Sequence, residues 1–235
     1  MLGIMPRRRY DQYCSVARAL DVVGDRWTLL IVRELLAGAR RYTDLHADLP
    51  GVSTDMLAGR LKDMERDGLT VRRRLDPPAA AFVYELTARG RALLPVLTAL
   101  ADWGAPELGA PRPTDAVRAH WFAVPLMPRL GRYFADQRAE DGPVRVVEVR
   151  LDEGTFHVTL DDEAGVQGRV PDAYGYADGP APAPDVVLEL DTAACAEVIY
   201  DRLSLAHGID TGRIRATVRG EPAGVTAATA RTATG

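Results

Sequence analysis

Side chains that can form directional polar contacts gather between residues 53 and 62, and one chemistry open to them is hydrogen bonding to nucleic acid. Hydroxyl, carboxylate, guanidinium and ammonium groups hydrogen-bond to base edges in a DNA major groove, which admits one α-helix. The candidates for contact with base edges are Thr54, Asp55 and Arg60. The candidates for contact with phosphates are Ser53 and Lys62.

Residues 52–68 have the pattern of one short amphipathic helix that would position these groups. Leu57, Leu61 and Met64 recur at i, i+4 and i+7, Ser53 can cap the helix, and Gly68 offers a left-handed stop. The polar and small residues then lie away from the core. Two interpretations remain open, an ordinary surface helix and a helix that enters a major groove.

Arg60 also allows two interpretations. Its guanidinium can contact a base or a phosphate, because cations on such a helix are the usual readers of guanine. It can instead pair with Asp63 or Asp67 across one helical turn.

Further cations lie close to this helix in the sequence. Arg40 and Arg41 precede it, and Arg72, Arg73 and Arg74 follow it. We include these five residues among the predicted DNA contacts, the last three as phosphate contacts.

Three helices are expected before residue 52. The first runs over residues 13–23 and ends at Gly24 in a left-handed C-cap. The second is capped by Asp25, carries an apolar stripe and stops at Gly38. A short third helix spans about 42–49.

After Gly68 the apolar period changes. Residues 69–75 and 82–87 are short stretches of β-branched and aromatic residues separated by DPPAAA, which predicts a β-hairpin. Thr87 can then cap a long helix that ends at Gly104 and is kinked at Pro95. Helices followed by such a hairpin make a winged helix-turn-helix, a mostly α domain with a β-hairpin wing, over residues 1–105.

Several ordered blocks of this half resemble the HxlR family of bacterial transcriptional regulators, which are MarR-like. They are Cys14, GDRWTLLIVRELLAG at 24–38, RRYTDL at 40–45, LPGVSTDMLAGRLKDMERDGL at 49–69, YELTARG at 84–90 and the pair Trp103-Gly104. The resemblance covers about residues 10–105. It implies a homodimer that binds double-stranded DNA, with most of the dimer contact made by the first and last helices of this half.

The predicted dimer contacts and one departure follow from the resemblance. The dimer residues are Tyr13, Val16, Leu93, Leu97, Leu100 and Trp103. Family members usually carry a basic residue in the wing, whereas this chain has Ala79, Ala80 and Ala81 there. The tip therefore lacks a cation for the minor groove, and residues 72–74 at its stem are the expected phosphate contacts.

Cys14 allows a second kind of function. Some relatives sense oxidants through a cysteine at the matching position, and Arg18 at i+4 would favour the thiolate. The other interpretation, which we favour, is a half-buried structural cysteine, since free cysteine is often buried.

The bulk composition excludes several classes of protein. The chain has 235 residues, 47% of them hydrophobic and 26% charged, as in a globular domain protein. No apolar run approaches the ~20 residues of a membrane-spanning helix, and the apolar segment at the start is too short for a signal peptide. We expect a cytoplasmic location and no membrane partner.

The charge is uneven, although the net charge is −4. Residues 1–105 hold 16 Lys and Arg against 13 Asp and Glu, and residues 106–235 hold 13 against 20. Two distant cysteines and four scattered histidines predict neither a disulfide framework nor a metal site. We also find no catalytic motif, so we expect no enzyme, no cofactor and no metal.

The second half is expected to be an α+β domain. Residues 106–114 form a Gly- and Pro-rich linker, and about 115–138 a helix interrupted near Pro125 and Pro128. Its expected buried face is Val117, Trp121, Leu126, Leu130 and Tyr133. Strands are expected at 144–151, 155–160, 166–170, 186–190 and 213–218, with a helix from Asp191 or Thr192 to Leu203.

Residues 115–222 resemble a sterol-carrier-protein-2-like domain through DVVLELDTAACAEVIYDRLSLAHGIDTGRIRATVRG at 185–220. This resemblance implies an apolar cavity between helices and sheet. Its candidate lining residues, each of which can equally be plain core, are Trp121, Phe122, Leu126, Phe134, Phe156, Val158, Ile199 and Leu203. Residues 223–235 are of low complexity and are expected to be a disordered tail.

Three functions are compatible with these patterns. The first is a sequence-specific transcriptional regulator that binds an inverted-repeat operator as a homodimer and responds to an apolar small molecule in the C-terminal domain. The second is a redox-sensing regulator that uses Cys14. The third is a carrier of lipid or another apolar ligand, with the winged helix as a docking module. We favour the first.

Overall fold

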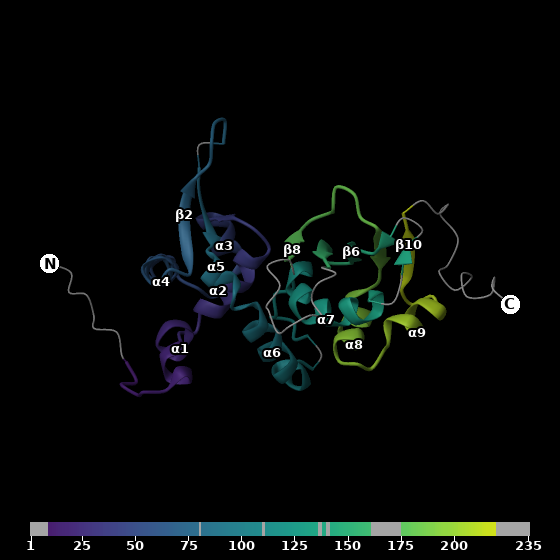
Figure 1. The fold of residues 1–235 in the computed structure, drawn as a ribbon, viewed down its shortest axis with the longest axis horizontal. Helices are drawn as coiled ribbons and strands as arrows, with labels where there is room; N and C mark the ends of the chain where they lie inside the picture. Colours follow the sequence, from purple (N-terminus) through teal and green to yellow (C-terminus); the bar gives the residue numbers. More distant parts are fainter. Residues whose placement is uncertain are drawn as a thin grey trace. The chain divides into compact units, whose positions relative to one another are not determined.

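The computed structural model describes residues 9–79, 81–109, 111–135, 138–139, 142–160 and 175–219 (Figure 1). They form two compact units. The first contains the chain up to Leu35 together with Ala39–Arg91, and the second contains Leu36–Gly38 and the chain from Ala92 onward. In the described residues no helix is both long and apolar enough to cross a membrane.

The first unit contains the helices that the sequence predicts. They are α1 (Ser15–Val23), α2 (Thr28–Leu36), α3 (Tyr42–Asp48) and α4 (Thr54–Arg66). Their apolar positions form the core of the unit, with Ile31, Leu35, Leu45, Leu57, Leu61 and Met64 all buried. The stripe at 57, 61 and 64 is thus confirmed as the buried face of α4, and Gly68 has the expected positive φ of 70°.

The end of α1 differs from the prediction. Gly24 has a φ of −73°, so it is not a left-handed cap. Its small size matters for another reason, because a Cβ at this position would lie 2.5 Å from the carbonyl oxygen of Leu20. Glycine is required here by close backbone approach rather than by backbone conformation.

The hairpin is present as β2 (Thr70–Arg74) and β3 (Phe82–Leu86). A third strand that the sequence analysis missed, β1 (Arg40–Arg41), pairs with β3, which gives an antiparallel sheet of order β1-β3-β2. Two residues are too few to show an alternating pattern, so only the fold reveals this strand. In Figure 1 the tip of the hairpin projects beyond the helices of its unit.

The predicted long helix after the wing is two separate helices, α5 (Ala88–Arg91) and α6 (Leu94–Gly104). The cap is confirmed, since Thr87 Oγ1 accepts a hydrogen bond from the backbone N–H of Gly90 at 3.1 Å. The kink is wrong, because Pro95 lies in the first turn of α6. A proline there removes no helical hydrogen bond, whereas inside a continuous helix it would remove one.

The second unit is built on a five-stranded mixed sheet of order β10-β9-β6-β7-β8. Its strands are β6 (Val146–Leu151), β7 (Gly154–Thr159), β8 (Gly175–Asp178), β9 (Val186–Glu189) and β10 (Arg215–Val218). The predicted hairpin around residues 152–154 is β6–β7, and β6 and β9 run parallel. A separate small pair joins β4 (Arg138–Ala139) to β5 (Gly142–Pro143).

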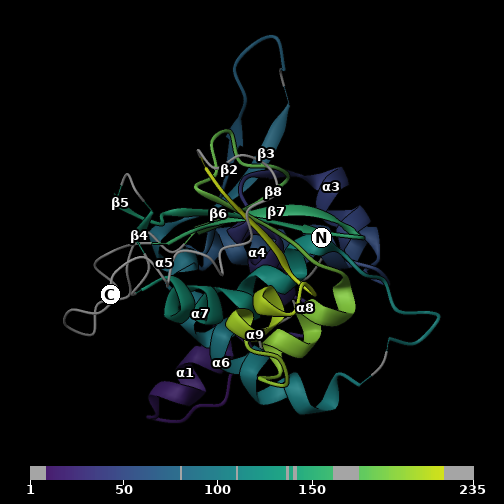
Figure 2. The ribbon, with the colours of Figure 1, turned by 90° about the vertical axis from the view of Figure 1, so that its right-hand side faces the viewer.

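Helices cover one face of this sheet, as Figure 2 shows for α7, α8 and α9. They are α7 (Ala123–Phe134), α8 (Thr192–Ile199) and α9 (Leu205–Asp210), preceded by the short turns η1 (Ala105–Glu107) and η2 (Ala119–Phe122). The sheet residues on the covered face are fully buried, namely Val147, Val149, Phe156, Val158 and Leu188. Together with the helices they form the core of the unit.

Two details of the second half correct the sequence analysis, and two of its predictions are not tested. The helix expected over 115–138 begins only at Ala123, and of its expected buried face just Leu126 and Leu130 are fully buried. The helix expected to reach Leu203 ends at Ile199, and α9 was missed. The strand at 166–170 and the tail at 223–235 lie outside the described residues.

Helix α6, which the sequence analysis assigned to residues 1–105, has its contacts in the second unit. There it packs against α7. Arg129 of α7 donates to Asp102 Oδ1 of α6 at 2.8 Å, which adds an ion pair to that packing.

Candidate nucleic-acid interface

Helix α4 presents one face to the core of its unit and the opposite face to solvent. With Leu57, Leu61 and Met64 buried, the helical period places Asp55, Gly59, Lys62 and Arg66 along the centre of the exposed face. Ser53, Thr54, Met56 and Ala58 are exposed as well. The exposed face therefore contains most of the residues that the sequence proposed for DNA contact.

The beginning of α4 is held by two hydrogen bonds. Ser53 Oγ accepts from the backbone N–H of Met56 at 3.3 Å, which confirms the predicted cap. Tyr42 Oη, at the start of α3, donates to the carbonyl oxygen of Thr54 at 2.7 Å. These contacts fix the direction of the exposed face relative to the rest of the first unit.

Arg60 is tied to the protein rather than extended into solvent. Its guanidinium pairs with Asp25, at the turn before α2, and with Asp63 at 3.6 Å, and only 17% of its side chain is exposed. The alternative of a pair along the helix is thus realised with Asp63, while Asp67 pairs with Arg66. A contact between Arg60 and a base would require both ion pairs to be broken.

A hollow of about 490 Å³ lies between α4 and the wing. It is lined by Tyr42, Ala58, Lys62, Glu65, Arg72, Phe82 and Tyr84. Most of these residues were not singled out from the sequence, because strand register and the packing of α4 bring them together. Alternation in the hairpin is the signal that would have placed 72, 82 and 84 on one side.

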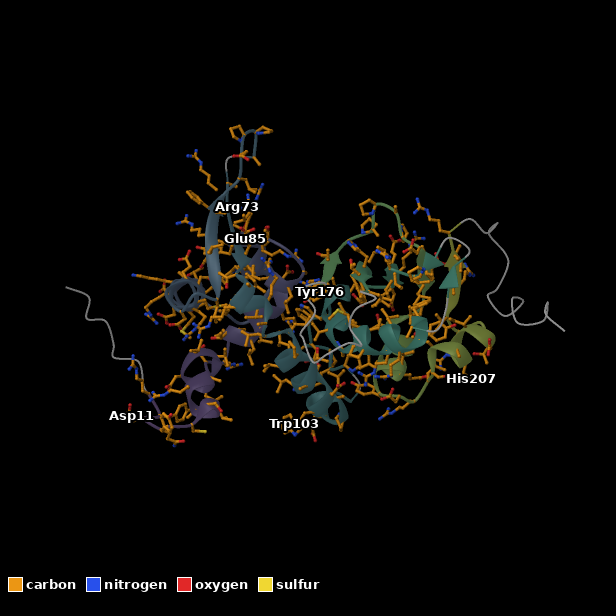
Figure 3. The ribbon with its side chains drawn as sticks, in the orientation of Figure 1. Asp11, Arg73, Glu85, Trp103, Tyr176 and His207 are labelled. Atoms are coloured by element: carbon orange, nitrogen blue, oxygen red, sulfur yellow. The ribbon has the colours of Figure 1, made fainter. Side chains whose placement is uncertain are left out.

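The three arginines of β2 do not lie on one face of the wing. Arg72 is opposite Tyr84 and Arg74 is opposite Phe82, so these four side chains share a face. Arg73 lies on the other face, where its Nε donates to Glu85 Oε1 at 3.1 Å (Figure 3). The sequence could not distinguish Arg73 from its two neighbours.

The cations of the interface differ in whether a carboxylate already neutralises them. Arg40 is within 4.0 Å of Asp48, and Arg73 is paired with Glu85. Within the described part of the chain, Lys62, Arg72 and Arg74 have no carboxylate partner. Arg41, at the start of α3, is exposed.

Two tyrosines line the hollow with different roles. The hydroxyl of Tyr42 already donates its proton to Thr54, as described above. Burial raises the pKa of Tyr84, and Glu65 and Tyr42 raise it further, whereas the nearby charge of Arg72 lowers it. Tyr84 therefore keeps its proton at neutral pH and remains a hydrogen-bond donor.

The two cysteines occupy opposite environments. Cys14 is exposed at the N-cap of α1, so the expectation of a half-buried structural residue is wrong. Arg18, the predicted activator of the thiolate, lies 3.6 Å from Asp21 in an ion pair. Burial raises the pKa of Cys195 to about 12, which leaves that thiol protonated and unreactive.

The residues predicted to form the dimer surface are mostly exposed. Tyr13, which precedes α1, and Val16 in α1 are exposed, and Val96, Leu100 and Trp103 form an exposed stripe on α6 at i, i+4 and i+7. Trp103 is 79% exposed and is labelled in Figure 3. Leu97 is a correction, because only 7% of it is exposed, and Leu93 is half-buried before α6 begins.

The residues predicted to line a cavity in the second unit lie in its core or at its edge. Leu126, Phe134, Phe156, Val158, Ile199 and Leu203 are buried, while Trp121 and Phe122 are half-buried. Among the described residues no cluster of His, Cys, Asp and Glu could hold a metal ion.

The chain is similar to known regulators over its first half. The HxlR-like helix-turn-helix family matches residues 22–110. The uncharacterised HTH-type transcriptional regulator YvaP of Bacillus subtilis is 36% identical over 86 residues, which are 37% of this chain and 80% of YvaP. An uncharacterised HTH-type transcriptional regulator of Mycobacterium tuberculosis is 38% identical over 117 residues, 49% of this chain and 73% of the relative.

A solved structure adds a third comparison. The reduced form of the transcriptional regulator YodB from B. subtilis is 30% identical and aligns with a TM-score of 0.37, covering 44% of this chain and all of YodB. The family match ends at residue 110, so the sterol-carrier-like character of residues 115–222 stays a prediction.

Proposed function

We propose, from the premise that this chain belongs to the HxlR-like helix-turn-helix family of transcriptional regulators, that it binds a specific DNA operator through α4. The observation that supports this most directly is the exposed face of α4, where Thr54, Asp55 and Lys62 are accessible beside the unpaired cations of the wing. A helix with such a face fits a major groove, and the flanking cations fit the phosphates beside it. The named relatives are transcriptional regulators, so we propose no enzymatic activity.

The binding species in this proposal is a homodimer. The stripe of Val96, Leu100 and Trp103 on α6 is exposed and apolar, and α1 exposes Val16 and Leu20. When two copies cover apolar stripes of this kind, the apolar surface is removed from water, which favours association. A twofold dimer presents two copies of α4, so the operator should be an inverted repeat with half-site centres about 10 bp apart or a multiple of that spacing.

The test is selection of DNA from a random duplex library by the purified full chain, followed by footprinting of the selected sequence. We expect a recovered sequence with dyad symmetry and a footprint that covers both half-sites. Recovery of no consensus, together with binding that disappears as salt rises, would contradict the proposal and favour the carrier function, with a winged helix that only docks.

A variant that disrupts the proposed dimer contact tests whether DNA binding requires the dimer. Replacing Leu100 and Trp103 by glutamate places charges on the proposed contact and should give a monomer in light scattering. The same variant should lose most operator affinity while retaining its circular dichroism. A variant that stays dimeric would place the dimer contact elsewhere.

We further propose that the second unit modulates DNA binding by holding an apolar small molecule between its helices and sheet. The support is the continuous apolar layer formed by α7, α8 and the covered face of the sheet. A molecule that prefers one arrangement of the protein can shift DNA affinity only by its difference in affinity for the two arrangements. Screening apolar ligands for release of the selected operator tests this, and a screen with no ligand bound would contradict it.

Exposure of Cys14 favours one alternative, regulation by oxidation. A reachable thiol is necessary for that chemistry, whereas Cys195 is buried. Mild oxidant should then weaken operator binding by the native chain but not by a Cys14→Ser variant. Unchanged affinity of the native chain after Cys14 is fully oxidised would eliminate this function.

A further inference from the structure

The hollow between α4 and the wing has the composition of a site for one singly charged anionic group. Lys62 and Arg72 supply two positive charges that no carboxylate neutralises in the described residues, and Glu65 supplies one negative charge. The methyl group of Ala58 leaves room beside them. The net charge of the lining is therefore +1, which suits a ligand with a single negative charge.

Arg72 is fixed in the direction of the hollow. Its guanidinium carbon lies 4.0 Å from the centre of the Phe82 ring, which is within the range of a cation–π contact. A guanidinium held in this way retains its hydrogen-bond donors and loses less side-chain entropy when it binds an anion. The site is thus partly organised before any ligand arrives.

Tyr84 adds a neutral donor to these cations. It lies directly opposite Arg72 across the β2–β3 pair, and its raised pKa keeps the hydroxyl protonated. The Tyr42 hydroxyl, by contrast, already donates to Thr54, so it shapes the hollow without offering a free proton.

The position of the hollow identifies the anion. Lys62 also lies on the exposed centre of α4, so a ligand in the hollow is immediately beside the helix proposed to enter a major groove. The edges of that groove are rows of phosphodiesters, each with one negative charge and accepting oxygens. We propose that the hollow binds one phosphodiester of the operator backbone through Lys62, Arg72 and the hydroxyl of Tyr84, and that Glu65 limits the affinity. This inference rests on the proposed function.

Arg73 provides the matched control. It belongs to the same strand and has the same charge as Arg72, but it lies on the other face of the wing with Glu85 as its partner. If only the overall positive charge of the strand attracted DNA, removing either arginine would lower the affinity equally. If the hollow binds a phosphate, removing Arg72 would lower the affinity more.

The experiment combines protein variants with single neutral linkages in the DNA. The selected operator is prepared with one methylphosphonate at each successive backbone position, and affinity is measured for the native chain, Arg72→Ala and Arg73→Ala. We expect Arg72→Ala to lower affinity about tenfold per half-site for specific and random duplex alike and to reduce the salt slope by about 2, one for each protomer of the dimer. Arg73→Ala should change affinity by no more than about twofold.

One backbone position per half-site should lose affinity when neutralised in the native complex, yet lose almost nothing further in the Arg72→Ala complex. That coupling is the signature of a direct contact. Tyr84→Phe should show a smaller loss at the same position, and Glu65→Gln should tighten binding several-fold. Circular dichroism of each variant checks that the fold is retained.

The outcomes separate this inference from the proposed function. If the native chain selects an operator but Arg72→Ala and Arg73→Ala behave alike, or if the losses multiply at every backbone position, the phosphate site is wrong and operator binding survives. If the native chain selects no operator, the proposed function is wrong and the inference falls with it.

Discussion

A set of cations in the second unit and a set beside α4 in the first unit have opposite surroundings. In the second unit a ladder of ion pairs crosses the face of the sheet opposite α7, α8 and α9. In it Arg215 contacts Glu189, Glu189 contacts Arg150, and Arg150 contacts the buried Glu148. In the first unit the described Lys62, Arg72 and Arg74 have no carboxylate partner. The cations of the ladder are therefore neutralised within the fold, while Lys62, Arg72 and Arg74 are available to a polyanion.

The largest expected effect is that of salt on DNA affinity. If the unpaired cations of two protomers make six or more phosphate contacts, raising salt from 50 to 200 mM should lower affinity by about 10³-fold or more, because condensed counterions are released on binding. Fluorescence anisotropy with the selected duplex measures this. A nearly flat dependence would remove the contrast between the units.

The same change in salt should barely move the unfolding of the protein. Exposed ion pairs contribute about 1 kcal/mol or less, and screening can remove no more than that. Thermal unfolding followed by circular dichroism at both salt concentrations is the matched measurement. A large shift in the unfolding midpoint would show that the ion pairs contribute more to stability than this estimate.

The next effect tests the ladder from its buried end. Glu148 is 2% exposed and accepts hydrogen bonds from Arg150 Nε at 2.7 Å and from the backbone N–H of Ala181 at 2.8 Å. Glu148→Ala should lower the free energy of unfolding by about 3 kcal/mol, since charged hydrogen bonds are lost and the N–H is left unsatisfied. Operator affinity at a temperature where the variant is folded should be unchanged.

Arg60 belongs to the paired cations of the first unit, like Arg40 and Arg73. Arg60→Ala should cost about 2 kcal/mol of stability through loss of its bonds to Asp25 and Asp63. Affinities for operator and random duplex should fall by similar factors, since the helix is less firmly held. Asp25→Asn should reproduce the stability loss, whereas relaxed specificity at one base pair would identify Arg60 as a base reader after all.

The smallest effect concerns Gly59, at the centre of the exposed face of α4. A Cβ there would meet no atom within 4 Å, so nothing in the described fold requires glycine. Gly59→Ala should stabilise the helix by about 0.5 to 1 kcal/mol while weakening operator binding, because the added methyl group would face the bases. Stabilisation without any loss of affinity would place the closest approach to DNA elsewhere.

Much of the first unit was predictable because its signals are local. The stripe at 57, 61 and 64, the Ser53 cap and the alternation in β3 each depend on neighbours within a few residues. The division at Pro95 was misjudged because a proline is compatible with a kink or with a helix start, and only packing decides between them. The start of α7, expected at about residue 115 and observed at Ala123, was also misjudged because only packing decides where that helix begins.

The candidate site was predictable only in part. The exposed residues of α4 follow from helical period, yet the engagement of Arg60 by Asp25 joins residues 35 positions apart. The hollow joins α3, α4 and both wing strands, and no local pattern brings Tyr42 to Tyr84.

The sequence by itself determined that α4 is amphipathic, that a hairpin follows it, and that the chain belongs to the HxlR-like helix-turn-helix family. These properties follow from apolar residues that recur every 3.6 or 2 positions and from short motifs, all of which depend on local geometry. Only the tertiary structure decided which cations are free, because partners such as Asp25 for Arg60 and Glu85 for Arg73 are set by packing and strand register. Whether a cation is free to bind a ligand depends on its neighbours in space, and local sequence patterns do not identify those neighbours.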